Sequence, residues 1–331
     1  KYIFAGRCSR SLNCQSKVIR MRFLFLIFIF YGAFSVWAQV HTFLNVQVEN
    51  DFINWWGKGS DRYYTGGNFI SVQRIWQNKA VCLIGTELVQ KAYTPSNLQA
   101  IKVEEMDFPY AGLLFMRNFI LISPAQKKWT LLLRISSGTS GPRSGVALFQ
   151  KRIHQWIGDE APQGWTTMQS SYPYNQIDIN FCHPLQLSSR VAMGIAHQWE
   201  GGTFYNRWVG QTWLFIGSSP VIYFVGTDSM IPVQWPHLSN NKKITGGLLI
   251  AAGIQYVVRD RIIEESVYSK TVFTPPIFSD VFLDRSIPQI SGSFFFHRQN
   301  IAFRLSQHWR AASLDLLPSH FYGAIGFSFH L

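Results

Sequence analysis

The chain has 331 residues and a formal net charge of +12, and its aromatic residues (16%) are as frequent as its charged residues (15%). Charged residues make up about 25% of an average soluble domain, so this composition would leave a water-soluble protein with a poorly hydrated surface. After residue 38, no uninterrupted apolar run reaches the roughly 18 residues of a spanning helix. The composition therefore excludes a helical membrane protein and favours one whose membrane segments are strands.

The start of the chain is typical of an export signal. Met21-Arg22 gives a basic start, an apolar run extends from Phe23 to about Phe34, and Val36-Trp37-Ala38 fits a small-residue cleavage site. The alternative, a transmembrane anchor, needs about 20 apolar residues, and this run is shorter. We therefore expect residues 1–38 to be a signal region and residues 39–331 to form one domain.

Half of the net positive charge belongs to this leader, whose six basic residues leave +6 for the remainder. We expect residues 1–20 to lie upstream of the translation start or to extend the signal. A moderately cationic exported protein suits an anionic lipid surface and has little access to nucleic acid. Cys82 and Cys182 could form one disulfide, but two thiols on separate apolar strands are more often packing residues.

Residues 39–331 contain about a dozen segments with the two-residue alternation of a strand. In Thr42–Glu49, for example, three aliphatic residues alternate with three polar ones. The predicted strands are Thr42–Glu49, Asn68–Trp76, Ala80–Leu88, Gly112–Ile122, Trp129–Ser136, Gln176–Phe181, Arg190–Trp199, Trp208–Ile216, Val221–Val225, Leu248–Val258, Ile290–His297, Ala302–Trp309 and Tyr322–Leu331.

Strands of about ten residues are long enough to cross a bilayer at a tilt. The last segment places Phe327, Phe329 and Leu331 on one side, as expected of a closing barrel strand that faces lipid. A soluble periplasmic sandwich is the alternative, because its strands also alternate. We predict an all-β protein, a monomeric transmembrane antiparallel β-barrel of about 12 strands. Aromatic girdles are expected from Trp55, Trp56, Tyr63, Tyr64, Trp129, Trp208, Trp309 and Tyr322.

One stretch, Gly141–Trp165, departs from this alternation. It predicts a short helix over Ser144–Ile157, since apolar residues recur at steps of three and four. Gln150 and His154 are four residues apart, so both project from one strip of the helix, and Glu160 follows just past its end. A histidine with an amide before it and a carboxylate after it has the parts of an oriented general base. The apolar side comprises Val146, Phe149, Ile153, Trp156 and Ile157.

Several motifs precede and include this helix: ENDF, DRYYTGG, YTP, FPYAGLLF and GPRSG…FQKRIHQWIG…PQGW. Taken singly, each is ordinary turn or strand-start chemistry. In this order, over Val48–Trp165, they resemble the lipid A 3′-O-deacylase family of outer-membrane enzymes. The resemblance implies a twelve-stranded barrel whose active site lies between the barrel wall and a helix supplied by an outer loop.

The resemblance also implies calcium-dependent hydrolysis of an acyl ester, with lipid A of lipopolysaccharide as substrate and outer-membrane lipids as surroundings. His154 stands at the family's helix histidine and would act as the base that takes a proton from water. Asp51 would help to hold Ca²⁺. The other site positions that match the family are Asn50, Thr65, Gln150 and Glu160.

The residue chemistry fits these roles. A carboxylate such as Asp51 is a hard-oxygen ligand that suits calcium, and the ion would polarise the ester carbonyl. The sequence contains no GxSxG, which argues against an α/β-hydrolase. It departs from the family in having no lysine over Ser96–Ile101, with Lys102 as a loose candidate, and in having Phe108 where arginine is common. Two alternatives remain: an outer-membrane phospholipase, and a non-catalytic porin or structural barrel with a relict site.

Overall fold

A computed structural model provides the coordinates of the protein. The predicted export signal, Trp56 and the predicted strand Val221–Val225 lie outside the part that it describes. The described ranges are 39–55, 62–77, 80–124, 128–167, 170–218, 244–263, 284–313 and 317–331.

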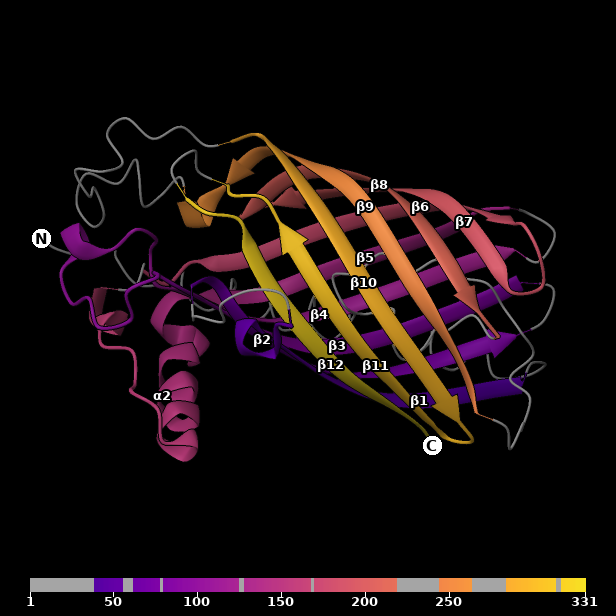
Figure 1. Ribbon diagram of the computed structural model, residues 1–331, viewed down its shortest axis with the longest axis horizontal. Coiled ribbons are helices and arrows are strands. Elements are labelled where there is room, and N and C mark those ends of the chain that lie inside the picture. Colours follow the sequence, from indigo (N-terminus) through magenta and orange to yellow (C-terminus); the bar gives the residue numbers. More distant parts are fainter. Residues whose placement is uncertain are drawn as a thin grey trace, which may run out of the picture.

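Within these ranges, twelve antiparallel strands form a closed barrel (Figure 1). Each strand pairs with its neighbours in the sequence, and β1 and β12 close the barrel with Phe43 opposite His330. The predicted fold class is therefore confirmed. The strands are β1 Gln39–Asn50, β2 Tyr63–Gln77, β3 Ala80–Thr94, β4 Ala111–Pro124, β5 Thr130–Ser140, β6 Pro173–Gln186, β7 Val191–Gly202, β8 Tyr205–Gly217, β9 Thr245–Asp260, β10 Ser286–Arg298, β11 Ile301–Arg310 and β12 His320–His330.

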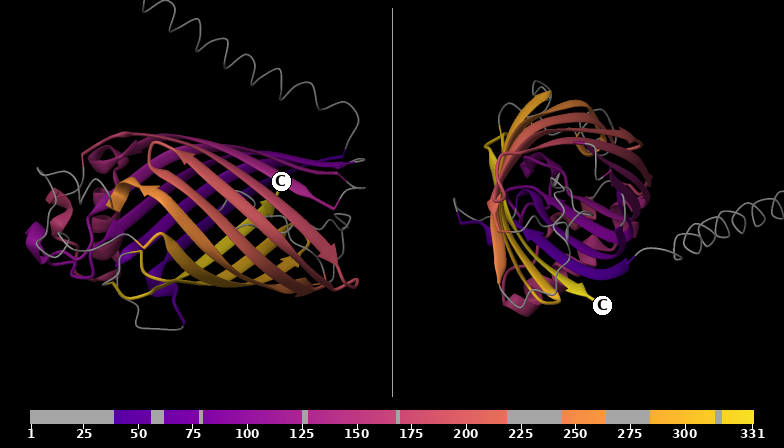
Figure 2. Two further views of the ribbon diagram at one scale, coloured as in Figure 1. Left: turned by 90° about the horizontal axis from the view of Figure 1, so that it is seen from above. Right: turned by 90° about the vertical axis from the view of Figure 1, so that its right-hand side faces the viewer.

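The two ends of the barrel differ. Four 3₁₀ turns and the helix α2 (Val146–Ile157) follow strands that run toward one end, whereas β1 begins and β12 ends at the other (Figure 2). The 3₁₀ turns are η1 Asp51–Ile53, η2 Val103–Glu105, η3 Gly141–Ser144 and η4 Gly164–Thr167. Outer-membrane barrels place their longer loops outside the cell, so the α2 end is the extracellular end. In the part of the chain that is described, no helix is long and apolar enough to span a membrane.

The alternation of side chains separates the lumen from the lipid face. In β6, Gln176, Asp178 and Asn180 are buried in the lumen, while Ile177 and Ile179 are exposed on the outside. The same division was predicted from the sequence, and it holds in β1 and β12. The outward residues form the apolar band that contacts lipid in this class of protein.

The lumen is packed with side chains. Near the ends of the strands opposite α2, the inward residues are apolar, with Phe43, Leu83 and Phe119 among the most buried. Closer to the middle they are charged: Arg117 donates to Glu87 at 3.1 Å, and buried Arg304 donates to Ser306 at 2.8 Å. Buried ions need such partners. The described side chains therefore form a core inside the barrel.

Two predictions about single residues have different outcomes. Tyr63, Tyr64 and Tyr322 line an internal cavity, so their placement in a lipid girdle was wrong, whereas Trp309 pairs with the exposed Ile290 and faces outward. Sequence alone could not show which side of a strand end such a residue faces. Cys82 and Cys182 are free thiols, and Cys182 packs in the apolar core of the barrel, as the packing interpretation expected.

Candidate functional site

The helix α2 is bounded by glycines that no other residue would replace without strain. Gly145 has φ of +68° and separates η3 from α2, and Gly158 ends the helix with φ of +76°. Glycine is favoured in this left-handed region because glycine has no Cβ that would clash with the backbone. The helix therefore begins at Val146, two residues later than predicted, while its end at Ile157 is as predicted.

The buried side of α2 is largely polar. Val146, Gln150 and His154 are its buried residues, at steps of four that place them in one strip. The predicted apolar residues Phe149 and Ile153 are exposed. The sequence pattern thus identified the Gln150–His154 strip, but among the predicted apolar residues only Val146 packs against the protein.

The start of α2 rests on the outer face of β3 and β4. A Cβ on Gly112 of β4 would collide with Ser144 Oγ and would lie 2.9 Å from Val146 Cβ. On β3, Gln90 Nε2 donates to the Ser144 carbonyl at 3.3 Å. Val89 beside Gln90 is buried in the lumen, so Gln90 faces outward. A glycine in β4 and an amide in β3 therefore position the helix.

His154 is oriented by the segment that follows α2. Its Nδ1 lies 2.8 Å from the backbone carbonyl of Glu160 and 3.5 Å from the Asp159 carboxylate. A carbonyl can only accept, so Nδ1 carries the hydrogen and Nε2 is the nitrogen able to take a proton. The Glu160 side chain is exposed. The sequence predicted a carboxylate from Glu160, whereas the contact is made by its carbonyl and by Asp159, which was missed.

Asn50 and Asp51 join β1 to η1. Asn50 Oδ1 accepts from Phe52 N at 2.7 Å and caps the turn. Asp51 is only 1% exposed, and its Oδ2 accepts from Arg62 N at 3.0 Å. The η1 turn folds over β12, where Gly323 leaves space for the Ile53 carbonyl. A buried carboxylate at a strand end is an uncommon, specific arrangement.

Thr65 lies where β2 changes register. The pairing with β3 shifts between Tyr64 and Gly66, which is the signature of a bulge that redirects a side chain. Thr65 Oγ1 and Thr94 Oγ1 are 2.5 Å apart, and both residues are buried. Thr94 is the threonine of the YTP motif. The sequence motif did not indicate that Thr94 would lie beside Thr65.

These residues lie on the outer side of the barrel wall. Glu49, Tyr64 and Tyr93 line a cavity of about 180 Å³ in the lumen. Their neighbours in the sequence, Asn50, Thr65 and Thr94, therefore face the opposite side of the wall. The lumen cavity is a separate feature, and the candidate site is outside it.

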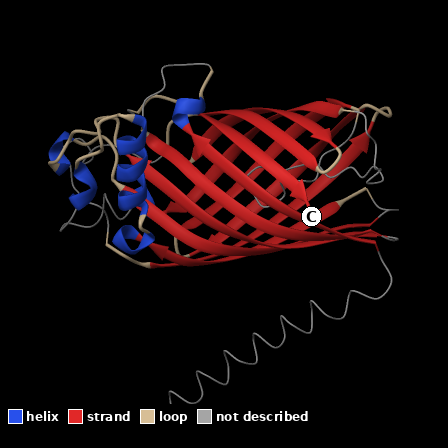
Figure 3. Cartoon of the chain, turned by 90° about the horizontal axis from the view of Figure 1, so that it is seen from below, coloured by secondary structure: helices blue, strands red, loops and turns tan. Residues whose placement is uncertain are grey.

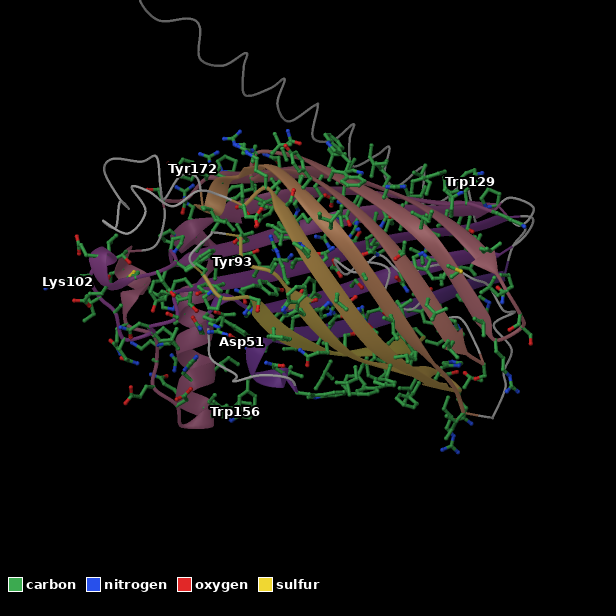
Figure 4. The ribbon with its side chains drawn as sticks, turned by 45° about the horizontal axis from the view of Figure 1, so that its top comes forward. Asp51, Tyr93, Lys102, Trp129, Trp156 and Tyr172 are labelled. Carbon is green, nitrogen blue, oxygen red and sulfur yellow. The ribbon has the colours of Figure 1, made fainter. Side chains whose placement is uncertain are left out.

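Two loops flank the site. The η1 turn contacts β12 and β2, whereas α2 contacts β3 and β4. Both lie at the extracellular end, where the helices gather (Figure 3), and the strand order of the barrel places β1, β2 and β3 between them. Figure 4 shows Asp51 at this end, beside α2. The structure therefore brings Asn50, Asp51 and Thr65 to one stretch of rim next to the helix that carries Gln150 and His154.

The remaining motifs hold the loops together. Phe108 of the FPYAG segment is buried and packs on Tyr63, with ring centroids 5.4 Å apart. Tyr110 packs on Trp165 at 4.8 Å and donates to the Leu98 carbonyl. Lys102 is exposed on η2. Where the family commonly has arginine, this chain thus has a core aromatic residue.

Comparisons with known proteins bear on the fold and on the family. A family model described as outer membrane protein LpxR matches residues 23–169. These residues make up less than half of the chain, and this stretch is similar to the LpxR family. The search of curated proteins found no match.

Among solved structures, an LpxR protein has the same fold. LpxR from Salmonella typhimurium is 16% identical, with a TM-score of 0.69, and the match covers 87% of this chain and 100% of that protein. The translocator domain of autotransporter NalP from Neisseria meningitidis is 9% identical, with a TM-score of 0.43 over 96% of this chain and 98% of that domain. The LpxR likeness supports the same barrel and, with the family model, an outer-membrane location for this chain.

Proposed function

We propose that the protein is a lipid A deacylase that hydrolyses a 3′-linked acyl ester, with a calcium ion and water activated by His154. The observation that supports the proposal most strongly is the burial and orientation of the His154 ring. It is buried on α2, and its Nδ1–H donates to the Glu160 carbonyl at 2.8 Å. The family match over residues 23–169 and the outer-membrane barrel support the substrate class.

The chemistry assigned to His154 follows from its tautomer. With Nδ1 protonated, Nε2 can remove a proton from a water molecule as that water attacks the ester carbonyl. The imidazolium formed would be stabilised by the Asp159 carboxylate 3.5 Å from Nδ1. As the bond between the acyl carbon and the sugar oxygen breaks, the same proton can pass to that oxygen, which leaves as a hydroxyl. No serine nucleophile is needed, in agreement with the absence of GxSxG.

The residues at the rim have the donor chemistry that calcium requires. Asp51 supplies a buried carboxylate, and the amide of Asn50 and the hydroxyl of Thr65 supply neutral oxygens. In the described ranges, no three His, Cys, Asp or Glu side chains gather as a metal cluster. We infer that calcium at Asp51 would take most of its remaining ligands from neutral oxygens and water. When bound, the ion would stabilise charge on the ester oxygen.

The two alternatives have less support. An outer-membrane phospholipase would use a serine–histidine pair, whereas His154 is oriented by a carbonyl and an aspartate. A porin would need a water-filled lumen, but the described inward residues include an apolar cluster of buried side chains. Ester hydrolysis on the outer wall therefore agrees best with the described geometry.

The first prediction concerns the base. We expect His154→Ala to lower deacylation by about 100- to 10,000-fold, the usual contribution of a general base. The neighbouring exposed residue provides a matched control, and Gln155→Ala should retain activity. Purified variants would be assayed on lipid A by mass spectrometry, with heat-modifiable gel migration as a check of barrel folding. Undiminished deacylation by folded His154→Ala would remove His154 from the mechanism.

The second prediction concerns calcium. Chelation with EDTA should abolish deacylation, and calcium should restore it better than magnesium because the site offers a flexible set of oxygens. Asp51→Asn removes a negative charge and should raise the calcium concentration needed for half-maximal activity. Calcium binding measured by calorimetry gives a readout independent of turnover. Activity that persists in EDTA would exclude the calcium role and leave the barrel fold untouched.

A further inference from the structure

The two loops that flank the candidate site both expose large apolar side chains. On α2, Trp156 is 85% exposed, and Phe149, Ile153 and Ile157 are also exposed. On the other side, Phe52 of η1 is 86% exposed. Monomeric soluble proteins rarely leave such residues gathered in water. Together these exposed residues form what we call the apolar rim, which comprises Phe52, Trp55, Phe149, Ile153, Trp156 and Ile157.

The apolar rim is continuous with the lipid band of the barrel. Val48 on β1 is exposed on the outer wall only two residues before Asn50, a rise of about 7 Å along a strand. Trp55 N donates to Gln307 Oε1 at 2.9 Å, which holds the segment after η1 against the outside of β11. The helix α2 extends sideways past the rim of the barrel, with Trp156 near its far end (Figure 4).

The polar residues of α2 fit the same environment. Lys151, Arg152 and Gln155 are exposed and occupy the side of the helix away from the Gln150–His154 strip. A helix with an apolar stripe, aromatic residues and adjacent cationic side chains is the pattern of a segment that lies in a membrane interface. Cations there would meet the phosphates of an anionic leaflet.

We propose that the apolar rim is buried among the acyl chains of the outer leaflet, so that α2 lies in the membrane interface beside the barrel. This inference rests on the fold and exposure of the loops, and it stands whether or not the protein is a hydrolase. It places the contact between α2 and the wall at the depth where the acyl chains of membrane lipids begin. The occupant of the rim is lipid, rather than a second copy of the chain.

The test measures the depth of α2 directly. In a background with Cys82→Ala and Cys182→Ala, single cysteines replace Trp156, Lys102 or Met116 and carry an environment-sensitive fluorophore. Met116 is exposed on the outer wall of β4 and serves as the lipid reference, whereas exposed Lys102 on η2 serves as the water reference. The folded proteins are placed in vesicles of phosphatidylcholine with brominated acyl chains, and iodide is added as the aqueous quencher.

We expect the label at position 156 to be quenched by brominated chains nearly as strongly as that at position 116. Its quenching by iodide should be several-fold weaker than at position 102. A label quenched by iodide and unaffected by bromine would place α2 in water and overturn the proposal. Protection from both quenchers would also overturn it, in favour of a protein contact such as a second copy. Labelling Phe52→Cys provides an independent repeat on η1.

Discussion

At the scale of single residues, the hydrogen bond between His154 Nδ1 and a backbone carbonyl distinguishes this site from a triad with a carboxylate orienter. A carbonyl fixes the tautomer as a carboxylate does, but it adds no full negative charge. The nearby Asp159 carboxylate is 63% exposed, so solvent screens its effect. Orientation of the ring should therefore depend mainly on the path of the backbone after Gly158.

The third prediction follows from this contact. Glu160→Gln should retain near-normal deacylation because it keeps the backbone carbonyl, and the carboxylate is exposed. Asp159→Asn should lower the turnover number by no more than about fivefold, since exposed ion pairs contribute up to about 1 kcal/mol. Steady-state kinetics on lipid A would measure both. A Glu160→Gln defect as large as that of His154→Ala would show that the carboxylate itself takes part.

At the scale of elements, the site depends on how closely α2 approaches the wall. Gly112 on β4 makes room for Ser144 and Val146, and Gly145 allows the chain to turn into the helix. Small displacements of a catalytic group have large kinetic costs. In the proposed mechanism, the packing of this loop on the strand would therefore matter as much as the identity of the residues that carry the chemistry.

The fourth prediction tests that packing. Gly112→Val would place a side chain in the volume of Val146 and push α2 outward, so activity should fall by about 100-fold while the barrel remains folded. Gly292→Val is the matched control on β10, because a Cβ there meets nothing within 4 Å. Deacylation and heat-modifiable migration would be compared for both. Equal activity of the two variants would show that the position of α2 is not critical.

Much of the element structure could be predicted from the sequence, because strand alternation reflects a physical difference between lumen and lipid. The polar residues of Thr42–Glu49 are buried in the lumen as the pattern indicated. The helix α2 has the opposite arrangement to a helix of a soluble protein: its polar strip is buried and most of its apolar residues are exposed. A rule that buries apolar residues fails when the surroundings are lipid. The contact of Glu160 through its backbone could not be read from a side-chain pattern.

At the scale of the whole molecule, the barrel separates two environments. The lumen holds charged pairs and an apolar core, while the candidate site lies on the outer wall with its rim residues at the edge of the lipid band. If the proposed function is right, this arrangement brings the site to a substrate that stays in the membrane. Because side chains alternate along β1 and β2, Glu49 and Tyr64 face the lumen. Asn50 and Thr65, next to them in the sequence, face the candidate site.

The fifth prediction tests whether the protein deacylates lipid A and whether this activity depends on His154. Lipid A would be extracted from Gram-negative cells that express the protein and from matched cells that express His154→Ala, and both would be measured by mass spectrometry. We expect the wild-type protein to yield lipid A lighter by one 3′-linked acyl chain, with its phosphates retained, and the variant to yield intact lipid A. Identical, fully acylated lipid A from both strains, with both proteins folded in the outer membrane, would contradict it.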